Sequence, residues 1–283
     1  MKFSEIKILF QQELSELYSK SEIEELFSIF AEHFLNLNKI ELRHNLENDL
    51  SESDFNQFSE AISELKTGKP FQQILGETEF YGLKFFVNEH VLIPRPETEE
   101  LLELAIGKIQ ELEIKNTGLK ILDIGTGSGI IPIVLKKYFP KAEVTSIDIS
   151  NEALDVAKRN ADFHKTEINF INKDYLNENL DEIYDIIISN PPYIGNEENP
   201  EIKDTVKGFE PNLALFSPTS DALIFYKKIS EDCKNHLQEN GLLFLEINQK
   251  LGQGTLELYQ DGFPEVELLK DISGNDRMIF GRK

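Results

Sequence analysis

The chain lacks several features that would assign it to a common class of protein. Its one cysteine, Cys233, excludes an intramolecular disulfide and a cysteine-rich metal site, and we expect no metal. It has no stretch of roughly 18 apolar residues, so no transmembrane helix is expected. The N-terminus also lacks the apolar core and the cleavage site of a secretory signal. These absences favour a cytoplasmic protein with no membrane partner.

Positive charge is scarce as well. The sequence has 29 Lys and Arg residues against 51 Asp and Glu residues, which gives a net charge of −22 at pH 7. Because non-specific affinity for nucleic acids comes largely from neutralising phosphates, this balance argues against direct nucleic-acid binding, although a local basic groove is compatible with it. Hydrophobic residues make up 40% of the chain, with 20 Phe and 8 Tyr, which is enough to fill a core. We therefore expect a folded enzyme or binding protein.

Residues 1–69 follow the period of α-helices. Apolar side chains recur there at spacings of three and four. Ser21 with Glu24 predicts the start of one helix, and the weaker pair of Ser51 with Asp54 predicts another. The segment is expected to form an N-terminal helical bundle, either a packing domain or a platform for a macromolecular substrate.

The period changes after residue 69. Aromatic residues that alternate around Gly82 predict a β-hairpin linker over residues 70–95, and strands and helices then alternate through residues 96–283. The expected strands cover 119–125, 142–150, 168–174, 184–190 and 241–247, with a final pair in 266–283. The expected helices cover 130–139, 151–163 and 221–240, and a long loop covers 194–220. This alternation predicts an α/β fold with a parallel sheet, helices on both faces, and ligands at the carboxyl ends of the strands.

The first of these strands leads into a glycine-rich turn, "DIGTGSG" (123–129). Gly125, Gly127 and Gly129 allow a tight turn and let a ligand approach the backbone closely. The spacing is G-x-G-x-G, whereas dinucleotide-binding turns have G-x-G-x-x-G. The turn is therefore a weak match to a nicotinamide-dependent dehydrogenase.

Residues near the ends of the first three strands indicate which ligand the turn binds. Asp148, at the end of the second strand, is placed for the two hydroxyls of a ribose. Asp123 would repel a pyrophosphate but suits the ammonium group of S-adenosylmethionine. Asp174 and Tyr175, after the third strand, could contact and cover an adenine ring. Together these residues favour a nucleoside pocket.

The fourth strand ends in "NPPYI" (190–194), a rigid corner because two consecutive prolines fix φ and donate no N–H. The Asn190 side-chain oxygen and the Pro191 carbonyl can each accept one hydrogen of a planar –NH2 group. Such acceptors hold the nitrogen in line with the methyl group and stabilise the developing charge, so no titrating base is needed. Tyr193 can lie against the flat face of the amide or base. Adenine N6, cytosine N4 and a glutamine side chain all fit this corner.

Six segments together resemble the family of peptide chain release factor glutamine N5-methyltransferases. They are "PFQQILGETEFYG" (70–82), "IPRPETE" (93–99), "DIGTGSG" (123–129), "NPPYI" (190–194), "FEPNLALFS" (209–217) and "DISGNDR" (271–277). The resemblance implies a Rossmann-like class I methyltransferase domain over 96–283, with a seven-stranded, mostly parallel sheet. It implies a small N-terminal helical domain over 1–69 that binds the release factor. The implied reaction is methylation of the side-chain amide nitrogen (N5) of the glutamine in the Gly-Gly-Gln motif of class I release factors.

The resemblance also implies site residues. The cofactor S-adenosylmethionine, with S-adenosylhomocysteine as product, is expected on the turn from Gly125 through Thr126, Gly127 and Ser128 to Gly129, and on Asp148, Tyr175 and Asn190. The substrate is expected on Asn190, Pro191, Pro192 and Tyr193, of which Asn190, Pro191 and Tyr193 would be catalytic. No catalytic role is assigned to Arg95 or Glu97, for which a structural ion pair at the domain joint is at least as good an interpretation. A monomer is expected.

Three other functions are weighed against this one. A methyltransferase for amino groups of nucleic acids, such as adenine N6, would need a basic surface near Asn190, but residues 194–220 contain two lysines against five acidic residues. If the chain were a nicotinamide-dependent dehydrogenase, the "NPPY" corner would have no function. An adaptor that binds release factors without chemistry would have no need for the asparagine.

Overall fold

The computed structural model describes residues 2–111, 118–194 and 208–283, which form two compact units. The first unit, Met1–Glu77, also includes Phe209. The second begins at Thr78 and continues to Lys283. Within the described residues, no helix is both long enough and apolar enough to cross a lipid bilayer.

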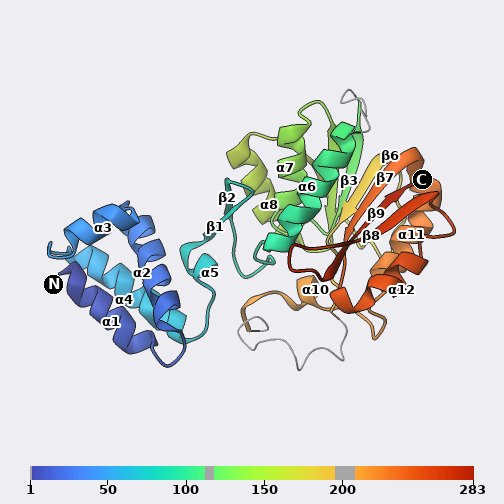
Figure 1. Cartoon of the computed structure of the whole chain (residues 1–283). Coiled ribbons are helices and arrows are strands. Elements are labelled where there is room, and N and C mark those ends of the chain that lie inside the picture. The colour runs from blue at the N-terminus through green and yellow to red at the C-terminus, as the bar shows by residue number, and fades with distance from the viewer. Residues whose placement is uncertain (1, 112–117, 195–207) are drawn as a thin grey trace. The chain divides into compact units, whose positions relative to one another are not determined.

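The first unit is helical and is packed around phenylalanine rings (Figure 1). Its helices are α1 (Phe3–Leu14), α2 (Lys20–Leu35), α3 (Lys39–Asn45), α4 (Glu52–Lys66) and α5 (Phe71–Leu75). The buried rings of Phe10, Phe27 and Phe58 meet with centroids 5.5–6.0 Å apart, within the range of favourable aromatic pairs. Burial of these rings explains why a segment rich in charged residues still folds as a bundle.

Helix α2 begins two residues earlier than the sequence pattern indicated. Its cap is Ser19, whose Oγ accepts from the Glu22 N–H at 3.4 Å while the Glu22 carboxylate accepts from the Ser19 N–H at 2.7 Å. The predicted pair of Ser21 with Glu24 is therefore wrong. The serine–acid pattern occurs twice here, two residues apart, and Ser21 lies inside the first turn.

The second unit contains a seven-stranded sheet in the order β5-β4-β3-β6-β7-β9-β8. Its strands are β3 (Lys120–Ile124), β4 (Glu143–Asp148), β5 (Asn169–Asn172), β6 (Tyr184–Ser189), β7 (Leu237–Glu246), β8 (Glu265–Lys270) and β9 (Asp276–Arg282). β9 runs antiparallel to both β7 and β8, and the other neighbouring pairs of the described sheet are parallel. This confirms the predicted α/β fold with a mostly parallel sheet and a final pair of strands. A separate hairpin consists of β1 (Glu77–Phe80) and β2 (Leu83–Phe86).

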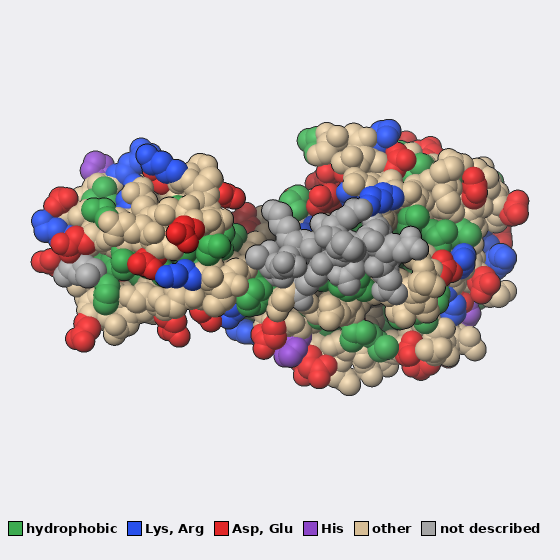
Figure 2. Space-filling view, turned by 90° about the horizontal axis from the view of Figure 1, so that it is seen from below, with side chains coloured by type: hydrophobic (Ala, Val, Ile, Leu, Met, Phe, Trp, Pro, Cys, Tyr) green, Lys and Arg blue, Asp and Glu red, His purple; other side chains and the backbone are tan. Residues whose placement is uncertain are grey.

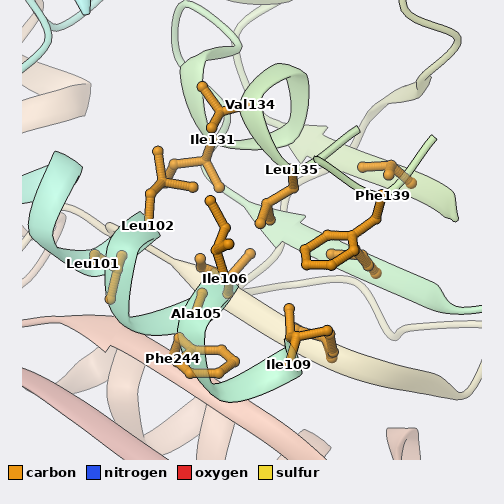
Figure 3. Close-up of a cluster of buried hydrophobic side chains, with 14 of the residues drawn as sticks. Leu101, Leu102, Ala105, Ile106, Ile109, Ile131, Val134, Leu135, Phe139 and Phe244 are labelled. Carbon is orange, nitrogen blue, oxygen red and sulfur yellow. The ribbon is translucent and has the colours of Figure 1, made fainter. Parts of the chain in front are cut away.

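Helices cover both faces of this sheet (Figure 1). Strand residues alternate between two buried clusters: Ile186 and Ile188 of β6 belong to one, and Ile187 belongs to the other. The first cluster includes α6 (Pro96–Glu111) and α7 (Ile130–Tyr138), and Figure 3 shows their side chains against Phe244 of β7. The second face carries α11 (Ile224–His236), and Cys233 is buried there as a small apolar side chain.

The remaining helices adjust the predicted boundaries. They are α8 (Asn151–His164), the short α10 (Asn212–Leu215), the 3-10 turn η2 (Gln249–Leu251) and α12 (Gly252–Glu257). Ser150 caps α8 by accepting from the Ala153 N–H at 3.0 Å, as predicted. Helix 221–240 was predicted too long, because α11 ends at His236 and the next residue already pairs in β7. Helix α10 lies inside the predicted loop 194–220, of which residues 195–207 are outside the described part.

Candidate active site

A cavity of about 730 Å³ lies at the carboxyl edge of the sheet, where α/β folds bind ligands. Four neighbouring strands lead into it: β5, β4, β3 and β6. Of the predicted site residues, those that line it are Gly125, Gly127, Asp148, Asp174, Tyr175, Asn190, Pro191 and Pro192. A second hollow of about 710 Å³ lies near the amino ends of the same strands and contains none of the predicted site residues. The predicted chemistry therefore converges on one cavity.

The glycine turn is held in a backbone shape that favours glycine. Gly125, Gly127 and Gly129 have φ angles of 80°, 52° and 82°, all in the left-handed region. At Gly129, an added Cβ would also lie 3.1 Å from the Ala157 Cβ. Gly127 and Gly125 line the cavity, whereas Gly129 provides the close contact between the turn and α8.

Asp148, the last residue of β4, is tied to this turn. Its Oδ2 accepts from the Gly127 N–H at 2.9 Å, and its Oδ1 accepts from the Ser150 N–H at 2.9 Å. Burial raises the pKa of the carboxyl above its ordinary value, and these backbone hydrogen bonds oppose the rise. Because each carboxylate oxygen can accept more than one hydrogen bond, Asp148 keeps capacity for two hydroxyl groups on the cavity side.

Asp123 lies beneath the turn and does not line the cavity. Its Oδ2 accepts from the Ser146 hydroxyl at 2.6 Å. Burial raises the pKa of Asp123 to about 7, and the hydrogen bond from Ser146 lowers it in part. Among the described residues, neither Asp123 Oδ1 nor the buried Thr126 Oγ1 has a hydrogen-bond partner. Thr126 is nevertheless close to Asp123, because its side chain also lowers the Asp123 pKa, and neither residue lines the cavity.

The connection after β5 supplies one wall of the cavity. Tyr175 is largely buried, and the Lys228 Nζ lies 5.1 Å from the centre of its ring. Asp174 accepts from the Asn177 side chain at 2.9 Å. The sequence analysis missed Ile149, which is 49% exposed and lines the cavity next to Asp148. An apolar residue just beyond a strand end was the available signal for a flat, apolar binding surface.

The asparagine corner faces the glycine turn, because the strand it follows, β6, pairs with β3. An added Cβ at Gly125 would lie 3.9 Å from the Asn190 carbonyl oxygen. The Asn190 Nδ2 donates to the Thr98 Oγ1 at 3.1 Å, and among the described residues no donor is bonded to the Asn190 Oδ1. Pro191 and Pro192 line the same part of the cavity. The corner thus presents a carboxamide oxygen and a stretch of backbone without N–H donors.

Tyr193 lies outside the cavity lining and belongs to a polar group behind the corner. Its Oη donates to the Glu246 Oε1 at 3.4 Å. Burial raises the pKa of Tyr193 above its ordinary value, and the neighbouring Glu246 raises it further. The tyrosine hydroxyl is therefore directed to the buried Glu246.

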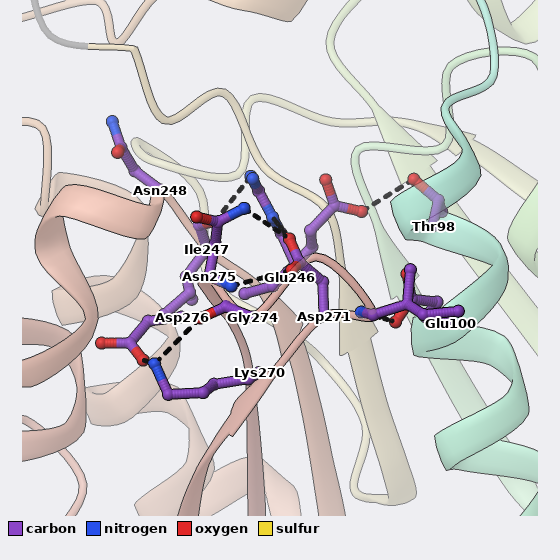
Figure 4. A network of polar contacts seen from close by, with 12 residues as sticks. Thr98, Glu100, Glu246, Ile247, Asn248, Lys270, Asp271, Gly274, Asn275 and Asp276 are labelled. Carbon is purple, nitrogen blue, oxygen red and sulfur yellow. Dashed lines mark hydrogen bonds and ion pairs between the residues drawn. The ribbon is translucent and has the colours of Figure 1, made fainter.

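Sequence reasoning missed Thr98 and Glu246, whose side chains meet in Figure 4, and Thr98 in turn accepts from Asn190. The Thr98 hydroxyl donates to the Glu246 Oε2 at 2.7 Å, and both side chains are buried. Burial raises the pKa of Glu246 to about 7, whereas the Thr98 hydroxyl and the Arg277 guanidinium lower it. A single acid at the end of the apolar strand "GLLFLEI" was the available signal, because buried carboxylates need partners.

Arg95 forms a structural ion pair with Glu210, but not at a joint between the units, because both residues belong to the second unit. Its Nη2 lies 2.6 Å from the Oε1 of Glu210, which is 1% exposed at the side chain. The Glu210 Oε2 accepts from the Ile93 N–H at 3.1 Å. This pair fixes the chain that leads into α6 to the chain that leads into α10, and Pro211 beside it lines the cavity.

The charges around the cavity do not form a phosphate-binding surface. Its three lysines each pair with an aspartate at 2.7–2.9 Å: Lys173 with Asp181, Lys227 with Asp221 and Lys228 with Asp232. Figure 2 shows acidic and basic side chains interspersed over the described part of one face of the molecule. Nucleic-acid binding relies on unpaired cations, and this cavity does not offer them within the described residues.

Two family models match the chain. Residues 8–76 match the PrmC N-terminal domain, and residues 108–206 match the methyltransferase small domain. A release factor glutamine methyltransferase of Flavobacterium psychrophilum is 47% identical over 273 residues, covering 95% of each chain. One of Streptococcus pneumoniae is 42% identical over 274 residues, covering 96% of each chain.

A solved structure shares the fold. The 16S rRNA N2 G1207 methyltransferase of T. thermophilus, in complex with AdoMet and guanosine, aligns with a TM-score of 0.50 at 18% identity. The alignment covers 73% of this chain and 49% of that one. At this identity the likeness concerns the fold alone.

Proposed function

The chain belongs to the release factor glutamine methyltransferases, and from this premise we propose that it methylates the side-chain nitrogen (N5) of the glutamine in the Gly-Gly-Gln motif of class I release factors. S-adenosylmethionine is the proposed methyl donor, and S-adenosylhomocysteine the product. The observation that carries the proposal is a single cavity lined by the glycine turn, Asp148 and the Asn190 corner.

The residues present fit this cofactor. Asp148 has acceptor capacity for the ribose hydroxyls, and Ile149 with Tyr175 offers apolar surface for adenine. The amino-acid end of the cofactor would be held at the turn, where Gly125 and Gly127 line the cavity and Asp123 and Thr126 lie beneath. We assign the turn from Gly125 to Gly129 and Asp174 to the same site. When bound, the cofactor supplies an electrophilic methyl group next to the asparagine corner.

The corner acts on the glutamine amide. An amide nitrogen is a poor nucleophile because its lone pair is delocalised. The Asn190 Oδ1 and the Pro191 carbonyl would accept hydrogen bonds from its two N–H groups, orient the nitrogen and stabilise the positive charge that develops on it, and one N–H proton would leave to solvent once the methyl group is attached. Pro192 keeps the corner free of a competing N–H donor, and the Tyr193 that follows it is held by its hydroxyl, which donates to Glu246.

The test mixes the protein with radiolabelled S-adenosylmethionine and a class I release factor. Label should enter the wild-type release factor and be absent from a variant whose motif glutamine is replaced. Label in neither release factor would refute the proposed function, and equal label in both would refute the assigned glutamine.

Two variants separate the assigned roles. Asn190→Ala should abolish methyl transfer while S-adenosylmethionine affinity stays within about tenfold, roughly 1.4 kcal/mol. Asp148→Ala should mainly weaken cofactor affinity, measured by calorimetry. Normal turnover in the first variant or unchanged affinity in the second would contradict the respective role.

We further propose that the protein acts as a cytoplasmic monomer, that its N-terminal helical unit binds the release factor, and that it binds no nucleic acid directly. The paired lysines around the cavity support the absence of direct nucleic-acid binding.

Sedimentation at several protein concentrations tests whether the protein is a monomer. Deletion of the helical unit should raise the KM for the release factor. Gel retardation on duplex DNA should show no salt-sensitive complex.

A further inference from the structure

A carboxamide has two ends of nearly the same size and opposite chemistry. The Asn190 Oδ1 can only accept a hydrogen bond, and the Nδ2 can only donate. A substrate –NH2 group needs the oxygen. The neighbouring prolines bring no N–H that could hold the oxygen end, so the orientation of the amide must be decided on its other side.

We propose that Thr98 and Glu246 are positioning residues that fix the Asn190 carboxamide with its oxygen toward the substrate nitrogen. The inference rests on the proposed function. The three side chains form one chain of hydrogen bonds: Asn190 Nδ2 donates to Thr98 Oγ1 at 3.1 Å, and Thr98 Oγ1 donates to Glu246 Oε2 at 2.7 Å.

The direction of this chain follows from the number of hydrogens. A hydroxyl has one hydrogen to donate, and the ionised Glu246 carboxylate has none; when Glu246 is neutral, Oε2 still accepts from Thr98 with the proton on Oε1. Because Thr98 donates its hydrogen to Glu246, its oxygen can only accept from Asn190, which must then present Nδ2. Thr98 is 2% exposed and Glu246 is 1% exposed, so water does not compete for these bonds.

Glu246 is itself held from several sides. Its Oε1 accepts from Tyr193 at 3.4 Å, and its backbone carbonyl accepts from the Tyr226 hydroxyl at 3.1 Å. Arg277 contributes a positive charge nearby and is fixed by Asp271, whose Oδ2 accepts from the Arg277 Nε at 3.3 Å. Figure 4 shows Asp271 and Glu246 in this network. The "DISGNDR" turn thus helps to keep the acceptor of the chain in place.

Thr98 comes from the "PRPETE" segment, for which the proposed function alone gave no task. It lies in the first turn of α6, with its N–H bonded to the Arg95 carbonyl at 3.1 Å. Arg95 is in turn anchored by the ion pair with Glu210. The segment therefore holds the Thr98 hydroxyl at a fixed position next to the Asn190 side chain.

Thr98→Val is the direct test, because it removes the hydroxyl and keeps the size of the side chain. Misorientation of a reacting group costs up to about 100-fold, so we expect kcat to fall by roughly 10- to 100-fold. The KM for the release factor and the affinity for S-adenosylmethionine should stay unchanged. Thr98→Ser, which keeps the hydroxyl, should restore most of the rate. A wild-type kcat in the valine variant, or no recovery in the serine variant, would overturn the proposal.

A matched control separates this effect from the general loss of a buried hydroxyl. Thr255 of α12 is also fully buried, and its Oγ1 donates to the Leu251 carbonyl at 2.9 Å. Thr255→Val should lower thermal stability and leave kcat unchanged. Equal losses of kcat in the Thr98→Val and Thr255→Val variants would count against a positioning role.

Two substitutions test the far end of the chain. Glu246→Gln keeps an oxygen that can accept from Thr98 and should retain most of the rate. Glu246→Leu removes the acceptor, frees the Thr98 hydrogen to donate to Asn190 Oδ1, and should lower kcat as much as Thr98→Val does. A leucine variant that is folded and as fast as wild type would contradict the proposed direction of the chain.

An activity-independent measurement separates this inference from the proposed function. In ¹⁵N-labelled protein, the Asn190 side-chain amide signal, identified by its loss in Asn190→Asp, should exchange slowly with solvent. The slow exchange should disappear in Thr98→Val and persist in Thr98→Ser. If it behaves so while no release factor is methylated, only the proposed function fails. If methylation occurs but the exchange rate of the signal is the same in Thr98→Val as in the wild type, only the positioning inference fails.

Discussion

Replacing Glu246 by glutamine removes a buried titratable group with little change in size, and it should change how stability depends on pH. Burial raises the pKa of this carboxyl from 4.5 to about 7. Thr98 and Arg277 lower this pKa and Glu97 raises it. The net result is a carboxyl that is mostly neutral in the folded protein below about pH 7. In the unfolded chain these contacts are lost, and the carboxyl regains its ordinary pKa.

The sign follows from proton binding. Between the two pKa values the folded protein holds a proton that the unfolded chain has released, so stability falls as pH rises. The slope reaches at most about 1.4 kcal/mol per pH unit for one group. Between pH 5.5 and 7.5 the loss should be about 2 kcal/mol, because ionisation is incomplete near both ends of the window. Above this range the contribution levels off.

The assay is urea unfolding at half-unit steps from pH 5.5 to 7.5, which stays above the isoelectric point of about 4.6. Tyrosine fluorescence reports the second unit, because Tyr18 is the only one of the 8 tyrosines before residue 78. The wild-type protein should lose about 2 kcal/mol more than Glu246→Gln over this range. Asp123, whose pKa burial also raises to about 7, titrates in both proteins and cancels in the difference.

Glu265→Gln serves as the control, since Glu265 is an exposed acid on the same sheet. Its stability should run parallel to that of the wild type. If Glu246→Gln also runs parallel to the wild type at every pH, then Glu246 is already ionised in the folded protein at pH 5.5, and the reasoning about its burial is refuted.

Three further substitutions test the packing. Gly129→Ala places a Cβ 3.1 Å from the Ala157 Cβ at a φ of 82°, and should lower the urea-derived stability by roughly 1–3 kcal/mol; an unchanged midpoint would contradict the strain. Phe58→Ala, at a fully buried ring, should destabilise the helical unit by about 3–5 kcal/mol in thermal unfolding followed by circular dichroism, and a loss below about 1 kcal/mol would contradict its place in the core. Arg95→Met leaves the buried Glu210 unpaired and should cost roughly 3 kcal/mol, and Glu210→Leu in the same chain should recover stability; no recovery would argue against an uncompensated buried charge.

The fold could be predicted from the sequence because its signals are local and repeated. The run Ile186 to Ile188 is apolar throughout because β6 is buried on both faces, and Ser150 caps the following helix by a contact three residues away. The start of α2 could not be chosen, since Ser19 and Ser21 both begin a serine–acid pattern. Tertiary packing decides between two such registers, and local pattern does not contain it.

The candidate site also has one part that the sequence predicts and one part that it does not. The glycine turn and the asparagine corner follow strands directly, so their meeting at one sheet edge follows from strand order. Thr98 and Glu246 are separated by 148 residues and join only in the folded chain. Each looked ordinary in isolation, one as a threonine in an acidic segment and the other as a lone acid in an apolar strand. Their pairing required the three-dimensional structure.

The ion pair between Arg95 and Glu210 has a consequence for how a ligand enters. Both carboxylate oxygens of Glu210 are engaged, so the start of the adjoining wall at Pro211 is anchored to the chain that leads into α6. Binding of a ligand against an anchored wall costs less conformational entropy than binding that requires a loose loop of the protein to become ordered. Affinity at this side of the cavity therefore depends on shape complementarity. A substitution of Arg95 or Glu210 should mainly change the dissociation rate of the ligand.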